Sequence, residues 1–133
     1  MKELDWDSSL NVGVDEIDDD HRRMVKLFNL LAHAVSNGDE PDYQEALLDE
    51  LIAYTVWHFR HEERLMLKYA YDDRDTHQQQ HRELIAGVTE IREKFLEGGR
   101  QLLEEDVEYL ERWVTAHIIH TDKKMGAYLA TAM

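Results

Sequence analysis

The chain has 133 residues, of which 43% are hydrophobic and 33% charged, a composition typical of a globular domain rather than a fibrous or disordered protein. Its formal net charge of −14 repels phosphate groups and anionic lipids, which argues against nucleic-acid binding and membrane insertion. Cysteine is absent, so disulfides, thiolate metal sites and cysteine nucleophiles are excluded. We see no signal peptide or membrane-spanning run, and therefore expect one cytoplasmic domain over residues 1–133.

Apolar residues recur at three- and four-residue steps in four segments, which predicts four long helices. Glycine and proline are scarce, and Gly38, Pro41 and the pair Gly98 and Gly99 fall between these segments. The helices are expected at about residues 18–36, 42–69, 75–97 and 100–127. Short links between long helices favour an all-α fold, an antiparallel up-down-up-down four-helix bundle.

The first residues of the chain lack helical periodicity. We expect residues 1–17 to form a non-helical leader that folds back on the bundle through Trp6 and Val12. The acidic run Asp18, Asp19 and Asp20 would then provide the N-cap and first turn of the first helix, where negative charge complements the helix dipole.

Five of the eight histidines lie on inward-facing stripes where leucine would be usual: His21, His58, His77, His81 and His117. Each buried ring has nitrogen atoms to satisfy, so five in one small core are costly unless they share a partner. A single core histidine is more often hydrogen-bonded to a neighbour, but that explanation would have to hold independently on four helices. A metal ion is the simpler partner, because neutral imidazole is a good ligand for iron, zinc and copper.

The spacings support one shared site. Two pairs are one helical turn apart and so lie on one face: His77 with His81, and His58 with Glu62. His117 and Asp122 are five residues apart, which is about 140° on a regular helix. We therefore expect a local i→i+5 widening between His117 and Met125, because such turns are frequent at functional sites.

The other three histidines carry no clear role. His61 and His120 are three residues from expected ligands, so they either border the core and support those ligands or are exposed to solvent. We favour solvated or rim positions for both, and a surface position for His33.

The motifs resemble those of the hemerythrin family, and especially of its single-domain bacterial members, from about Trp6 to Met125. A lone histidine, His21, is preceded by the stretch Val12-Gly13-Val14-Asp15-Glu16-Ile17-Asp18. Three motifs follow in the family's order: His58-Phe59-x-x-Glu62-Glu63, His77-x-x-x-His81 and His117-Ile118-x-x-x-Asp122. The resemblance therefore covers nearly the whole chain and every expected ligand.

This resemblance implies two non-haem iron ions joined by an oxo or hydroxo group. One iron would be held by His77, His81 and His117, and the other by His21 and His58. Glu62 and Asp122 would bridge the two irons. The second iron would keep an open position for dioxygen.

The resemblance implies reversible dioxygen binding for oxygen transport, storage or delivery, with no catalysis and with an unidentified protein as acceptor of the oxygen. Two alternatives remain at this point. One is an oxygen or redox sensor that acts through a partner protein. The other is a di-iron enzyme that handles peroxide or nitric oxide.

The open position would need a dry apolar wall, because water and protons would promote the loss of the bound oxygen as peroxide. The candidates for this wall are Phe28, Phe59, Trp113, Val114 and Ile118. Relatives often have leucine at the position of Val114, where the side chain is thought to gate the pocket. The shorter valine would widen that pocket.

Overall fold

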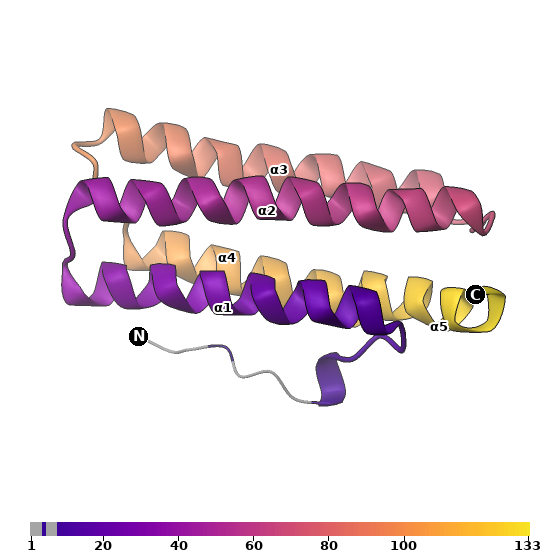
Figure 1. Ribbon diagram of the computed structural model, residues 1–133. Coiled ribbons are helices and arrows are strands. Elements are labelled where there is room, and N and C mark those ends of the chain that lie inside the picture. The colour runs from indigo at the N-terminus through magenta and orange to yellow at the C-terminus, as the bar shows by residue number, and fades with distance from the viewer. Residues whose placement is uncertain (1–3, 5–7) are drawn as a thin grey trace.

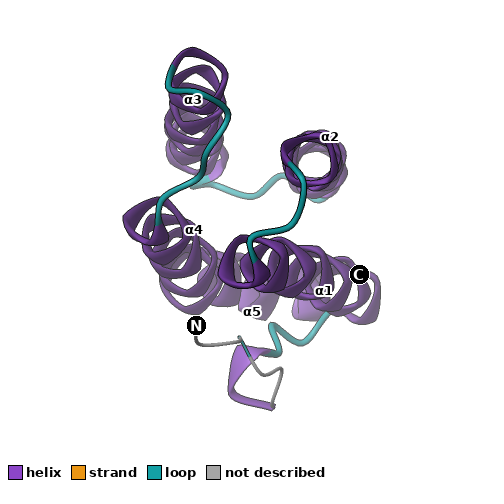
Figure 2. Cartoon of the chain, turned by 90° about the vertical axis from the view of Figure 1, so that its left-hand side faces the viewer, coloured by secondary structure: helices purple, strands orange, loops and turns teal. Residues whose placement is uncertain are grey.

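The protein, described here as a computed structural model of Leu4 and residues 8–133, consists of helices joined by short links (Figure 1). The elements in chain order are η1 Ser8–Leu10, α1 Asp15–Asn37, α2 Pro41–Lys68, α3 Arg74–Glu97, α4 Glu104–Ala116, the π-helical turn η2 His117–Asp122 and α5 Lys123–Ala132. Helix α4, η2 and α5 continue one another as the fourth rod, and Figure 2 shows the rods end-on. The expected all-α four-helix bundle is confirmed.

Adjacent rods of the bundle contact each other, and α5 at the end of the fourth rod also contacts α2. Helices α1 and α3 lie diagonally opposite, and both contact α2 and α4. Fully buried apolar side chains such as Phe28, Leu51, Phe95 and Leu110 fill the space between the rods. None of the described helices is both long enough and apolar enough to cross a bilayer. The core thus gives the bundle a rigid frame on which inward-facing polar groups can be placed.

Helix α1 begins earlier than expected, at Asp15, so the interpretation of the acidic run as a cap is wrong in part. Asp18 still lies in the first turn, but its Oδ1 accepts a hydrogen bond of 2.8 Å from the backbone N–H of Val12. Asp20 lies beyond that turn and is buried. These carboxylates are expected from the sequence at the N-cap and first turn, whereas Asp18 and Asp20 are buried inside the fold.

The fourth rod begins at Glu104, later than the expected start near Arg100. Gly99 and Arg100 have φ angles of 83° and 60°, in the left-handed region that a right-handed helix does not contain. Helix α4 starts where the carboxylate of Asp106 accepts a hydrogen bond of 3.1 Å from the backbone N–H of Leu103. The glycine pair therefore marks the end of α3 correctly but is followed by a longer link than expected.

The segment before α1 crosses the last helix at Gly126. Val12 is buried, and a Cβ atom on Gly126 would lie 2.1 Å from its carbonyl oxygen, closer than atoms can approach. Nearer the N-terminus, the backbone N–H of Leu4 donates to Oδ1 of Asn29 at 2.9 Å, and Nδ2 of Asn29 donates to the carbonyl of Leu4 at 2.8 Å. Val12 thus makes the fold-back contact expected of it, whereas Trp6 lies outside the described residues.

Replacing Gly126 with alanine tests this crossing. Helix propensity alone would stabilise the protein by about 1 kcal/mol. Because the new methyl group overlaps the backbone of Val12, we expect Gly126→Ala instead to lower the free energy of unfolding by about 1–3 kcal/mol. Urea denaturation measures the change, and a variant as stable as the wild type or more so would contradict the close crossing.

Candidate metal centre

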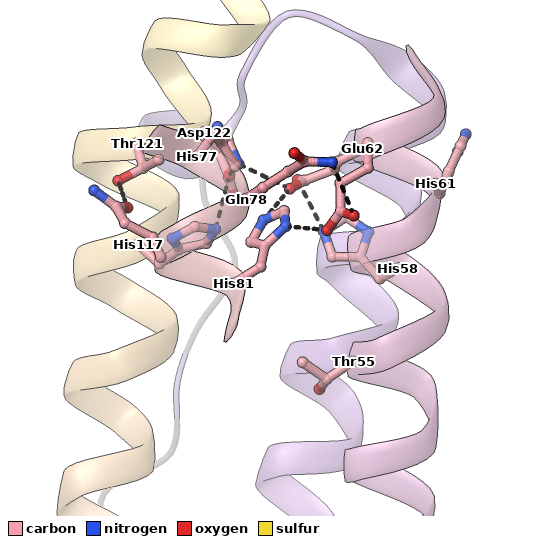
Figure 3. A network of polar contacts seen from close by, with 12 residues as sticks. Thr55, His58, His61, Glu62, His77, Gln78, His81, His117, Thr121 and Asp122 are labelled. Carbon is pink, nitrogen blue, oxygen red and sulfur yellow. Dashed lines mark hydrogen bonds and ion pairs between the residues drawn. The ribbon is translucent and has the colours of Figure 1, made fainter. Parts of the chain in front are cut away.

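The seven side chains expected to bind metal converge inside the bundle, where Figure 3 labels six of them, all but His21. They come from all four rods, and both ends of η2 contribute one. All seven are buried, and the exposed fraction is 0% for four of them: His21, His58, Glu62 and Asp122. Because each rod is held by the packed core, these side chains need no loop to bring them together.

The three-histidine group surrounds one oxygen atom from each of two carboxylates. Glu62 Oε1 lies 3.2 Å from Nε2 of His77 and 3.0 Å from Nε2 of His81. Asp122 Oδ1 lies 3.1 Å from Nε2 of His77 and 3.0 Å from Nε2 of His117. The five donor atoms lie within 4.8 Å of one another, as ligands of one ion do.

The two-histidine group faces the other oxygen atom of each carboxylate. Glu62 Oε2 lies 3.3 Å from Nε2 of His21 and 3.0 Å from Nε2 of His58. Asp122 Oδ2 lies 3.0 Å from Nε2 of His21. Glu62 and Asp122 therefore each divide their two oxygens between two groups of imidazoles, which is the geometry of carboxylates that bridge two ions.

The donor atoms fit cations better than they fit one another. Nε2 of His58 and His81, Oε2 of Glu62 and both oxygens of Asp122 are buried without a hydrogen-bond partner. Buried polar atoms are nearly always satisfied, and these come within 3.0–3.3 Å of each other without the angles of a hydrogen bond. Atoms that converge in this way are arranged as ligands around shared ions.

The electrostatics keep both bridging carboxylates charged. Burial opposes ionisation of Glu62, but the positive charge of His58 and close contacts with His21 and His77 outweigh it and hold the pKa of Glu62 well below its usual value. The pKa of Asp122 is also lowered, because His117 and His21 outweigh burial and the charge of Glu62. A cation that enters this site meets two ready carboxylates.

The same contacts place protons on the imidazoles that a metal must displace. Burial disfavours the charged form of His58, yet the charge of Glu62 and the contact with Asp20 raise the pKa of His58 to about 10. The pKa of His77 rises to about 9, because contacts with Asp122 and Glu62 outweigh its burial. Metal binding at this site therefore releases protons.

Two further carboxylates orient the rings of the site. Nδ1–H of His58 donates to Asp20 Oδ2 at 2.8 Å, and Nδ1–H of His81 donates to Glu63 Oε2 at 2.8 Å. In the neutral ring that binds a metal, each bond fixes the tautomer whose Nε2 lone pair points toward the cluster. Asp20 stays ionised: hydrogen bonds from His58 and His61 outweigh its burial and lower its pKa.

Of the positions considered for His61, the structure favours the border of the core over a solvated position. Its ring is half-buried, and Nδ1–H donates to Asp20 Oδ2 at 2.6 Å, so His61 belongs to the supporting groups instead. His33 and His120 are exposed, as expected.

Sequence reasoning missed Asp20 and Glu63 as supporting residues. Asp20 shares a stripe of i, i+4, i+7 spacing with Met24 and Leu27, and all three are buried, so an acid on an apolar stripe was a usable signal. Glu63 sits on the turn next to Glu62, and only the position of α3 shows which ring it meets. Pairings between helices of this kind have no counterpart in the spacing along one helix.

The expected widening of the last helix is confirmed. The turn η2 from His117 to Asp122 is π-helical, and the backbone N–H of Lys123 donates to the carbonyl of Ile118, five residues earlier. The wider turn brings His117 and Asp122 onto the side of the helix that faces the cluster. There the ring of His117 meets the ring of His77, and Oδ1 of Asp122 lies near Nε2 of both histidines. A regular helix would have directed one of them away.

The five candidates for an apolar wall are all buried, but they differ in their relation to the site. The ring of Phe59 stacks on His81 with 3.8 Å between centroids and 4° between planes, and meets His117 edge-on at 5.5 Å. Trp113 lies 5.9 Å from Phe59 and lines a hollow of about 370 Å³ beside His117. The roles of Phe28, Val114 and Ile118 in an oxygen pocket stay predictions.

Comparison with known proteins agrees with this site. Residues 12–129 match the family model described as the hemerythrin HHE cation binding domain. The chain belongs to the hemerythrin family. It is 35% identical to a bacteriohemerythrin of Pseudomonas paraeruginosa over 122 residues, 92% of this chain and 78% of that protein. It is 31% identical to myohemerythrin-1 of Phascolopsis gouldii over 90% of this chain and 88% of that one.

Solved hemerythrin structures share the whole fold. The wild-type crystal structure superimposes with a TM-score of 0.88 at 27% identity, covering 96% of this chain and 98% of that one. A point-mutant form gives a TM-score of 0.90 with 98% and 99% coverage. As a hemerythrin, the protein has a non-haem di-iron centre, and the buried cluster of histidine, glutamate and aspartate is the site whose donor atoms suit it.

Proposed function

We propose that this hemerythrin carries or stores dioxygen, which it binds reversibly at its di-iron centre, and that it does so without turning over a substrate. The observation that carries the proposal is the unequal division of ligands around Glu62 and Asp122. His77, His81 and His117 would hold one iron, and His21 and His58 the other. Both carboxylates would bind both irons.

This assignment leaves the iron beside His21 and His58 with one protein ligand fewer. That iron is the one that can accept an exogenous ligand without losing a side chain. When bound there, two ferrous ions would supply the electrons for holding dioxygen and would regain them on its release. The chain's own contribution is to fix the ligands through Asp20 and Glu63 and to keep the surroundings dry through buried rings such as Phe59.

The composition of the donor set supports binding over oxidation chemistry. Ferritin-like di-iron proteins use a glutamate from two helices and a Glu-x-x-His motif from two more, whereas this centre has five imidazoles and two carboxylates. With less negative charge, the site stabilises high-valent iron less well, so cleavage of the O–O bond is disfavoured. We therefore assign the chain a binding role and no enzymatic one.

Reversible oxygenation tests the proposal. The iron-loaded protein, reduced anaerobically and then exposed to air, should develop an oxygenated spectrum that persists and is lost again under vacuum. Repeated cycles should consume no reductant beyond slow autoxidation. An enzyme would instead use reductant in proportion to the oxygen removed, and that result would overturn the carrier role.

The ligand assignment is tested by comparing neighbouring residues. Glu62→Ala removes a carboxylate that would bind both irons, so we expect the iron content to fall from about two per chain to less than one. His61→Ala, one residue away, removes only a contact with Asp20 and should keep nearly two. Quantitative iron analysis after reconstitution measures both, and equal losses would show that Glu62 is not a ligand.

A further inference from the structure

A groove of about 380 Å³ lies between α2 and α3, on the outer side of the metal centre. Its walls include Val56, Ile85 and Ala86, and Phe59 forms part of its lining. The volume falls within the range of small-molecule sites, and the apolar walls favour a flat apolar body. The groove is separate from the hollow beside His117, whose lining is more polar.

Two guanidinium groups border this groove in a chain whose net charge is −14. Arg60 and Arg82 are both exposed. In the described part of the chain neither has a carboxylate within ion-pair distance; Arg82 donates instead to the amide oxygen of Gln79 at 2.6 Å. The groove also contains one carboxylate, Glu63, which accepts a hydrogen bond from His81 rather than pairing with an arginine. The two arginines therefore suit a ligand that carries a phosphate or carboxylate group.

The groove also reaches the metal centre through aromatic contact. Phe59 lines it, and the ring of Phe59 lies parallel to the imidazole of His81 with 3.8 Å between centroids. Nε2 of His81 faces the bridging carboxylate Glu62 at 3.0 Å. His81 and its hydrogen-bond acceptor Glu63 line the groove as well. A redox-active ring in the groove would therefore be one aromatic layer away from a ligand of the centre.

We propose that this groove binds a planar, redox-active aromatic anion of the flavin mononucleotide type, which reduces the centre. The inference rests on the proposed function, because a carrier whose irons have been oxidised to the ferric state must regain the ferrous state. The reduced flavin gives up two electrons and two protons and becomes the oxidised flavin. Each of the two ferric ions takes one electron and becomes ferrous, and the protons pass to solvent.

The division of roles within the groove follows from its chemistry. The isoalloxazine ring lies against the aliphatic walls, where its apolar area is removed from water, and the largely buried Phe59 contributes only a small part of the contact surface. The phosphate is held by Arg60 and Arg82, whose forked donors match its oxygens. The negative charge elsewhere on the chain disfavours binding of the same anion at other positions.

Binding of flavin mononucleotide itself is the first test, and it needs no iron. Titration of the metal-free and the iron-loaded protein should quench flavin fluorescence with one site per chain. Arg60→Glu with Arg82→Glu should weaken binding at least tenfold. Ala86→Phe, which fills the groove without changing charge, should weaken it similarly.

A matched control separates the groove from long-range charge. Arg22→Glu with Arg112→Glu makes the same change in net charge on α1 and α4, away from the groove, and should leave the affinity within twofold of the wild type. Equal weakening by both double variants would overturn the proposal, as would unchanged affinity in Ala86→Phe or the lack of saturable binding by the wild type.

The redox step is tested by stopped-flow reduction of the diferric protein under anaerobic conditions. Reduced flavin mononucleotide should reduce Arg60→Glu with Arg82→Glu at least tenfold more slowly than the wild type, whereas dithionite should reduce both at equal rates. Equal rates with the flavin would refute the groove as its site but leave oxygen binding intact. A chain that takes up no iron would refute the proposed function, while flavin titration still decides whether the groove binds.

Discussion

Five imidazoles and two carboxylates are removed from water at one level of this bundle. The rest of the structure must compensate the unfavourable free energy of burying these polar groups. Buried polar groups are costly unless each finds a partner, and here several donor atoms meet without hydrogen bonds between them. Two cations shared through Glu62 and Asp122 would remove this cost. The packed apolar core elsewhere supplies the rigidity that holds the four rods around the cluster.

The backbone itself is adapted to this constraint. His117 and Asp122 could not both face the cluster from a regular helix, and the π-helical turn η2 corrects the angle at the expense of regular hydrogen bonding. The segment before α1 crosses α5, which follows this turn, and Gly126 leaves room there for the backbone of Val12. The π-helical turn η2 and Gly126 thus lie close together in the chain, and both adapt the backbone at the end of the bundle that carries the site.

Much of this could be predicted from the sequence, because helix periodicity, ligand spacing and breakers are local. The ligand set and the widened turn between His117 and Asp122 both follow from positions on single helices. What could not be predicted depends on the backbone of the links and on contacts between helices. The start of α4 depends on the left-handed backbone of Arg100. The supporting role of His61 depends on Asp20, which is expected from the sequence in the helix cap and first turn. Glu63 needed the position of α3 to reveal its partner His81.

Carrier chemistry requires a centre that is held firmly but stabilises oxidised iron only weakly, and an imidazole-rich donor set behind buried rings meets both needs. The central claim is that two irons share Glu62 and Asp122. Anomalous diffraction at the iron absorption edge, from crystals of the iron-loaded protein, tests it most directly. The account predicts two peaks, one beside His77, His81 and His117 and the other beside His21 and His58, with both carboxylates between them. A single peak, or peaks that Glu62 and Asp122 do not join, would contradict it.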